Sequence, residues 1–129
     1  MAQRILIVDD EEAILSAMKD YLESYEWAVD CARDVGEAEA LLAQARYAVV
    51  IADLRLSPTQ AIGGLDLIAH VREKYPTTRT VLLTAYGSSQ VEGEARRLGV
   101  DAFLHKPQPL SEIVKIVYGV VGIGKPERI

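Results

Sequence analysis

Two apolar runs that end in carboxylates decide the fold, Arg4-Ile-Leu-Ile-Val-Asp-Asp10 and Tyr47-Ala-Val-Val-Ile-Ala-Asp53. Runs with so little polar alternation are typical of strands that are buried on both faces of a parallel sheet. Parallel strands end at one edge of their sheet, and ligands bind at that edge. The two runs therefore predict that Asp9, Asp10 and Asp53 lie together at one edge.

A cluster of three carboxylates is costly, because like charges a few ångströms apart raise each other's pKa. A hard divalent cation with oxygen ligands removes this conflict. We therefore predict a Mg²⁺ site formed by Asp9, Asp10 and Asp53. A helix-capping role for the same aspartates is the simpler alternative, and for Asp9 and Asp10 it is compatible with metal binding.

Two further runs end in polar side chains. Thr80–Thr84 ends in a hydroxyl, and Ala102–His105 is followed by Lys106-Pro107. A phosphoryl group at the same edge would meet a metal, an ammonium and a hydroxyl, which are the recurring parts of phosphoryl-transfer sites. Taken alone, Thr84 fits an ordinary β-branched strand residue and Lys106 fits a solvated loop lysine.

Strands and helices alternate five times along the chain. We expect strands at Arg4–Val8, Trp27–Ala32, Tyr47–Ala52, Thr80–Thr84 and Ala102–His105, and helices at Glu11–Tyr25, Asp34–Ala45, Leu65–Lys74 and Ser89–Leu98 and from Leu110 or Ser111 onward. This alternation predicts an α/β fold, a doubly wound five-stranded parallel sheet with five helices on its two faces in three layers.

Four short motifs stand in order, each after an expected strand: Ile5-Leu-Ile-Val-Asp-Asp-Glu11, Asp53-Leu54, Leu83-Thr-Ala85 and Lys106-Pro107. With these motifs the chain resembles the receiver domains of two-component response regulators over residues 3–121. The resemblance implies the flavodoxin-like strand order 2-1-3-4-5, which puts the first and third strands side by side.

The resemblance also implies the roles of the acidic residues. Asp53 would be the phosphoacceptor, receiving a phosphoryl group from a sensor histidine kinase or a phosphotransfer protein. Asp9 and Asp10 would bind Mg²⁺ together with Asp53, and the backbone carbonyl of Arg55 would complete the protein ligands.

The remaining family positions belong to the fourth and fifth strands. By resemblance, Lys106 would contact the phosphoryl group and precede a cis peptide bond to Pro107. Thr84 would hydrogen-bond a phosphoryl oxygen and act with Phe103 as the conformational switch. Phe103 has no hydroxyl and can signal only by packing. We expect His105, the neighbour of Lys106, to be structural or exposed to solvent.

The expected function is a switch with slow self-dephosphorylation, which is not a turnover enzyme acting on an outside substrate. A Mg²⁺-dependent aspartyl-phosphate hydrolase is one alternative, although the usual Asp-x-Asp spacing is absent from Asp9-Asp10-Glu11. A pseudo-receiver that binds partners without phosphorylation is another. It would be favoured by the loss of a site residue, and all five are present.

Length and charge limit the function classes. At 129 residues we expect one receiver domain over residues 1–121, with 122–129 as a loose tail or the start of a linker. The net charge of −5 argues against direct binding of nucleic acid. The single cysteine, Cys31, is expected to be a small buried strand residue. One cysteine can form no intrachain disulfide, which fits a cytoplasmic location. No apolar stretch long enough for a membrane span is present.

The chain departs from the common family pattern in three places. The loop from Leu54 to Gly63 is a few residues longer than usual, and its Pro58 and Gly63-Gly64 predict a mobile, turn-rich border of the site. Gln108 stands where many members have phenylalanine. Tyr86 lies two residues past Thr84, at a position that tunes phosphorylation lifetime in the family.

The last helix carries more apolar residues than one buried stripe requires. The row facing the sheet is expected to be Leu110, Ile113, Val114, Val117 and Val121, and a second row is Ile116, Val120 and Ile123. The second row predicts an interface for a homodimer or an output partner. The resemblance implies the same location, since family members pair or bind targets through the fourth helix, fifth strand and fifth helix. In the alternative, Gly119 and Gly122 end the helix early and a folded-back tail covers the core.

Overall fold

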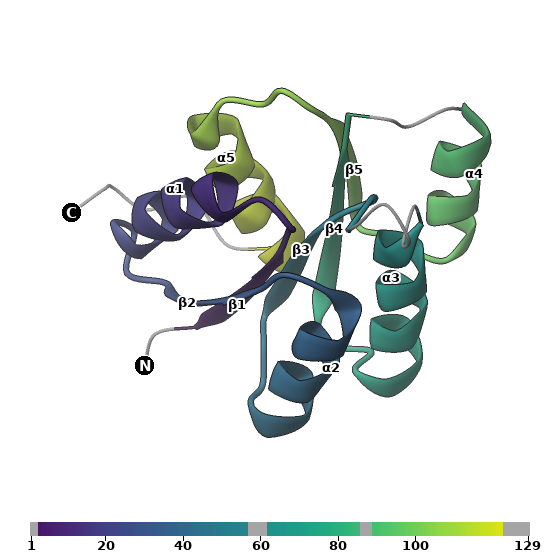
Figure 1. Ribbon diagram of the computed structural model, residues 1–129, viewed down its shortest axis with the longest axis horizontal. Helices are drawn as coiled ribbons and strands as arrows, with labels where there is room; N and C mark the ends of the chain where they lie inside the picture. The colour runs from purple at the N-terminus through teal and green to yellow at the C-terminus, as the bar shows by residue number, and fades with distance from the viewer. Residues whose placement is uncertain (1–2, 57–61, 86–88, 123–129) are drawn as a thin grey trace.

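The computed structural model describes residues 3–56, 62–85 and 89–122. Five parallel strands form one sheet in the order β2-β1-β3-β4-β5, as predicted (Figure 1). The strands are β1 Arg4–Val8, β2 Ala28–Ala32, β3 Val49–Asp53, β4 Arg79–Thr84 and β5 Ala102–His105. Since β1 and β3 are neighbours, the ends of the two carboxylate-bearing runs lie side by side.

Five helices cover the two faces of the sheet (Figure 1): α1 Glu12–Glu23, α2 Val35–Gln44, α3 Gly63–Lys74, α4 Ser89–Arg97 and α5 Leu110–Val121. Because successive strand residues point to opposite faces, the sheet supplies two cores. One core joins α1 and α5 to side chains such as Ile5 and Ile51, and the other joins α2, α3 and α4 to side chains such as Leu6 and Leu82.

Local sequence signals explain several boundaries. Asp34 caps α2, since its side chain accepts a hydrogen bond from the Glu37 N–H at 2.8 Å. The Glu37 carboxylate in turn accepts the Arg33 N–H at 2.9 Å. Gly99 follows α4 with a φ of +90°, a backbone conformation that glycine adopts without a Cβ penalty.

Three local expectations are wrong. The Gly63-Gly64 pair, expected in a turn, begins α3 and is buried. Cys31 is only half-buried, because β2 is an edge strand. Trp27 precedes β2 rather than opening it, and its buried indole donates a hydrogen bond to the Tyr118 hydroxyl at 3.0 Å. Tyr118, absent from the predicted core face of α5, is therefore part of that core.

The predicted loop and tail can be followed only in part. Leu54 and Leu56, at the start of the long loop, are buried in the core of α2, α3 and α4. Residues 57–61, with Pro58, lie outside the described part, as do Tyr86 and the tail from Ile123. Among the described helices, none is long and apolar enough to cross a lipid bilayer.

Candidate functional site

The carboxylates of Asp9, Asp10 and Asp53 meet at the carboxyl edge of the sheet. Val8 pairs in register with Ala52, so Asp9 and Asp53 follow as neighbours at the ends of β1 and β3. Each of the three aspartates offers an oxygen atom, and these atoms all lie within 4.8 Å of one another. Asp9 and Asp53 are buried, with 2% and 8% exposure, whereas Asp10 is exposed. The cluster thus has a closed inner side and an open outer side.

Lys106 provides a positive charge at the inner side of this cluster. Its Nζ donates a hydrogen bond to Asp9 Oδ2 at 2.9 Å and lies 3.3 Å from Asp53 Oδ2. The Lys106 N–H donates to the Thr84 carbonyl at 2.8 Å, which fixes the start of the β5–α5 loop against β4. The peptide bond from Lys106 to Pro107 is cis.

The protonation equilibria reflect this crowding. Burial raises the pKa of Asp53; the Lys106 ammonium opposes this effect and the Asp9 charge adds to it, so that the pKa stays above its ordinary range. For Lys106, burial acts to lower the pKa, but the hydrogen bond to Asp9 and the charge of Asp53 outweigh it and the pKa is raised. One ammonium therefore leaves the three carboxylates incompletely neutralised.

The donor set suits a hard divalent cation. The cluster offers carboxylate oxygens from Asp9, Asp10 and Asp53, and Mg²⁺ and Ca²⁺ both prefer oxygen ligands. A cation would also favour the ionised form of Asp53 against the effect of burial. Arg55 lies two residues beyond Asp53, and the role of its carbonyl as a further ligand stays a prediction.

The two residues predicted as the switch, Thr84 and Phe103, lie on β4 and β5. Asp53 pairs in register with Leu83, so Thr84 is one residue further along the neighbouring strand and is fully buried. Phe103 on β5 pairs with Leu82 and is buried against the core that includes α4. The sequence motifs thus converge at one edge of the sheet, in the order that the resemblance implies.

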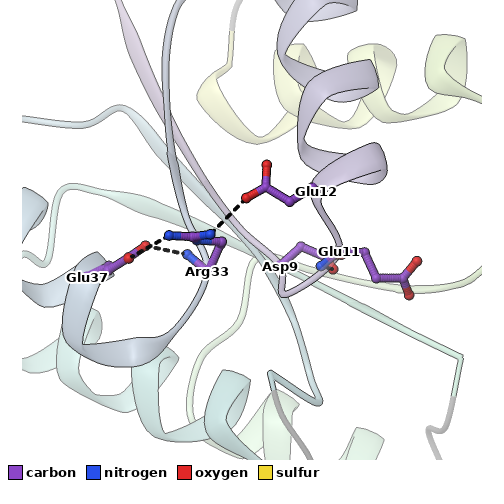
Figure 2. A network of polar contacts seen from close by, with 5 residues as sticks. All are labelled: Asp9, Glu11, Glu12, Arg33 and Glu37. Atoms are coloured by element: carbon purple, nitrogen blue, oxygen red, sulfur yellow. Dashed lines mark hydrogen bonds and ion pairs between the residues drawn. The ribbon is translucent and has the colours of Figure 1, made fainter.

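A polar network next to Asp9 was not anticipated from the sequence (Figure 2). The Glu11 N–H donates to Asp9 Oδ1 at 3.0 Å and holds this carboxylate at the start of α1. Beside it, Arg33 forms ion pairs with Glu12 of α1 at 2.9 Å and with Glu37 of α2 at 3.7 Å. Arg33 directly follows β2 and so joins the starts of α1 and α2 at the edge of the site. Arg33 and Glu12 are 21 residues apart, so the sequence alone did not indicate that they pair.

Gly64, which the sequence predicted in a turn at the border of the site, packs against the backbone of Asp53 instead. A Cβ at this position would lie 2.4 Å from the carbonyl oxygen of Asp53 and 2.8 Å from Leu54 Cα. The Gly64 N–H donates to the Leu54 carbonyl at 2.9 Å. The first turn of α3 therefore packs directly on the backbone of the candidate phosphoacceptor, and this close approach requires glycine.

The second apolar row of α5 is less exposed than the sequence predicts. The helix continues through Gly119 to Val121, so it does not end early. Ile116 and Val120 are half-buried and pack at the border of the core under α1 and α5. Among the described residues, Ile62, at 52%, is the one exposed large hydrophobic side chain.

Known proteins with similar sequences are response regulators. The chain is 33% identical over 125 residues to the response regulator protein PilR of Pseudomonas aeruginosa, covering 97% of this chain and 27% of PilR. It is 37% identical over 112 residues to the photosynthetic apparatus regulatory protein RegA of Cereibacter sphaeroides, covering 84% of this chain and 58% of RegA. The chain thus spans less than two thirds of the length of either relative.

Solved structures agree in fold. A CheY-like receiver domain protein from Methanospirillum hungatei has a TM-score of 0.88 at 25% identity and 95% coverage of both chains. A Burkholderia pseudomallei response regulator with a phosphorylated aspartic acid, calcium and citrate has a TM-score of 0.82 at 27% identity, covering 93% of this chain and 69% of that one. The beryllofluoride-activated NtrC4 receiver domain dimer has a TM-score of 0.83 at 27% identity, with 92% and 96% coverage.

The family model described as the response regulator receiver domain matches residues 5–118. The matched residues include the three aspartates and Lys106. They also include all five strands, except for Arg4 at the start of β1. The match covers most of the chain and agrees with the strand order and with the acidic cluster. The chain is therefore a member of the response regulator receiver domain family.

Proposed function

We propose that Asp53 accepts a phosphoryl group from a sensor histidine kinase or a phosphotransfer protein, and that Mg²⁺ is the cofactor. The observation that carries the proposal is the approach of Lys106 Nζ to both Asp9 and Asp53 within a group of three carboxylates. Fixed charges of both signs at one sheet edge are suited to binding phosphoryl oxygens and a metal together.

The reaction is a displacement at phosphorus. An Asp53 carboxylate oxygen forms a bond to phosphorus while the bond from phosphorus to the donor histidine nitrogen breaks, and the electron pair leaves with the imidazole. Lys106 donates hydrogen bonds to the phosphoryl oxygens, and the Thr84 hydroxyl binds one of them. When bound, Mg²⁺ supplies positive charge to the same oxygens, and Asp9, Asp10, Asp53 and the Arg55 carbonyl would hold it.

Receiver domains are in general not enzymes acting on outside substrates, and the activity proposed here is limited to one phosphoryl group per chain. The phosphoryl group is lost slowly by self-dephosphorylation, in which water attacks the phosphorus of aspartyl phosphate and the Asp53 carboxylate leaves. We also propose a cytoplasmic location, which suits the family context and a chain whose single cysteine, Cys31, can form no intrachain disulfide.

The first experiment measures covalent labelling. The protein is incubated with Mg²⁺ and acetyl phosphate, and its intact mass is recorded by mass spectrometry. We expect one base-labile phosphoryl group, which Asp53→Asn abolishes. Asp66→Asn, which alters an exposed carboxyl on α3, is the matched control and should label like the wild type. Equal labelling of Asp53→Asn and the wild type would refute the assignment.

Phosphorylation would control pairing or partner binding through α4, β5 and α5. Support comes from the NtrC4 receiver domain, which is a dimer in its beryllofluoride-activated form, and from Ile116 and Val120 at the border of the α5 core. Sedimentation with and without beryllofluoride tests this. Ile116→Lys should abolish an activation-dependent dimer, whereas Ser111→Lys at an exposed α5 position should not. A monomer in every condition would leave an output partner as the role of this face.

A further inference from the structure

Phe103 and His105 lie on the same face of β5, because side chains two residues apart on a strand point the same way. Their ring centroids are 5.3 Å apart and their planes are inclined by 74°, an edge contact between aromatic rings. Phe103 is buried, whereas the His105 side chain is 61% exposed. Across the strand pair, Leu82 lies opposite Phe103 and Thr84 opposite His105. His105 thus covers the outer side of the Phe103 ring, next to the buried Thr84.

The imidazole of His105 also reaches α4. Its Nε2 lies 3.8 Å from Oε1 of Glu92, which forms an ion pair when the imidazole is protonated. The other oxygen of Glu92 accepts hydrogen bonds from Arg96 on the same helix, at 2.8 and 3.1 Å. One side chain of β5 therefore contacts both the Phe103 ring and the carboxylate of Glu92, which is itself a residue of α4.

The backbone on both sides of this contact is held in place. The Lys106 N–H donates to the Thr84 carbonyl at 2.8 Å, and Gln108 Nε2 donates to the His105 carbonyl at 2.8 Å. These two hydrogen bonds restrain the backbone around His105.

We propose that His105 is a positioning residue, which couples the position of the Phe103 ring to the position of α4 through Glu92. Phenylalanine has no hydroxyl, so Phe103 alone can form no polar contact with α4. His105 supplies the polar contact, with its ring edge on Phe103 and its Nε2 on Glu92. The proposal rests on the proposed function, because the movement that it transmits begins with phosphorylation at Asp53.

The composition of the chain makes this proposal testable. Phe103 is the single phenylalanine among 129 residues, so incorporation of 4-fluorophenylalanine gives one ¹⁹F resonance at the switch. The backbone amide of Gly93, in the middle of α4, reports the helix in ¹⁵N spectra. Both signals are recorded with Mg²⁺, before and after addition of beryllofluoride, at one fixed pH.

The expected result separates the two signals. In the wild type, beryllofluoride shifts both the ¹⁹F resonance and the Gly93 amide. In Glu92→Gln and in His105→Leu, the ¹⁹F resonance still responds, but the Gly93 response falls by about half or more, because the two elements are no longer coupled. Glu94→Gln is the matched control, since it also removes an α4 charge but one that pairs with Arg97 within the helix.

Two further results decide between explanations. Arg96→Gln removes the intrahelical partner of Glu92 and keeps His105, so a wild-type Gly93 response is expected. A reduced response in Arg96→Gln, or a full response in Glu92→Gln and His105→Leu, would overturn the proposal. Acetyl phosphate labelling of Asp53 should stay within about twofold of the wild type in the His105 and Glu92 variants. Loss of labelling in the wild type would instead refute the proposed function.

Discussion

Gly64→Ala tests how closely the first turn of α3 packs on the phosphoacceptor strand. The new Cβ would lie 2.4 Å from the Asp53 carbonyl oxygen, 2.8 Å from Leu54 Cα and 2.9 Å from Leu82 Cδ1. Real Cβ atoms essentially never approach other heavy atoms closer than 3.0 Å. Because two of the three atoms belong to the backbone, rotation of a side chain cannot relieve the clash, and α3 or the end of β3 must move by more than half an ångström.

The expected magnitude follows from two opposing effects. Forcing an extra methyl group into a well-packed region costs about 1–3 kcal/mol. Replacing glycine by alanine within a helix increases the free energy of unfolding by about 0.5–1 kcal/mol. The Gly64 N–H also donates to the Leu54 carbonyl at 2.9 Å, so a retreat of α3 weakens this hydrogen bond. We therefore expect a net loss of about 1–2 kcal/mol, or a decrease in Tm of roughly 4–8 °C for a domain of this size.

Urea unfolding and thermal melts measure this loss, and two other glycines serve as controls. A Cβ added at Gly93 or Gly119 meets nothing within 4 Å, so alanine at these helical positions should increase stability by up to about 1 kcal/mol. Gly64→Ala should also slow acetyl phosphate labelling, because the displaced backbone carries Asp53. A Gly64→Ala protein as stable as the two control variants would refute the packing argument.

Three further predictions concern the site and the core. The first is measured in a chelating buffer, so that no metal is bound. Burial raises the pKa of Asp53 in the folded protein. The stability that Asp53 contributes in its protonated form is therefore full below the ordinary pKa of 3.8 and is lost as the pH rises through the raised pKa. Asp53→Asn should therefore raise the Tm near neutral pH and give no gain near pH 4 in paired thermal melts. Tyr118→Phe leaves the buried Trp27 N–H without its acceptor and should cost about 1–3 kcal/mol in urea unfolding followed by the fluorescence of this single tryptophan. Arg33→Gln breaks exposed ion pairs and should cost less than about 1 kcal/mol, and the cost should shrink at high salt; a cost that is unchanged in 1 M salt would contradict a surface electrostatic origin.

The sequence was informative where chemistry follows strand geometry. An apolar run buried on both faces must end where the backbone leaves the sheet, and Asp9 and Asp53 mark two such ends on neighbouring strands. Parallel pairing then determines that their carboxylates meet, whatever the details of the loops. The meeting of the motifs at one edge could therefore be predicted from parallel strand geometry, whereas the strand order that makes β1 and β3 neighbours came from the resemblance to the receiver family.

The errors occurred where a local pattern has more than one structural use. The composition of Gly63-Gly64 is typical of a turn, yet the pair begins α3. Glycine is required at position 64 for a different reason, since only a residue without a Cβ can approach the Asp53 carbonyl so closely. Tyr118 is absent from the predicted core row of α5, yet it is buried, and its hydroxyl accepts the Trp27 N–H, 91 residues away in sequence. A partner so distant in sequence leaves no periodicity to detect.

The half-buried row on α5 shows the same limit from the other side. Helical spacing indicated correctly that Ile116 and Val120 lie beside the buried row of α5. It could not indicate how much of each side chain neighbouring elements would cover, because coverage depends on how α1 and α5 settle on the sheet. Both residues are therefore less exposed than the width of the apolar arc predicts.

The charge arrangement of the site links its two proposed properties, cation binding and reactivity. A carboxylate can attack phosphorus only when it is ionised, yet burial favours the protonated form of Asp53 despite the nearby Lys106. Lys106 divides its contacts between Asp53 and Asp9, at 3.3 and 2.9 Å, so it does not neutralise either carboxylate alone. A divalent cation held by the three aspartates would supply the missing charge and would favour the reactive form of Asp53. The metal requirement of the proposed reaction therefore follows from the burial that brings the carboxylates together.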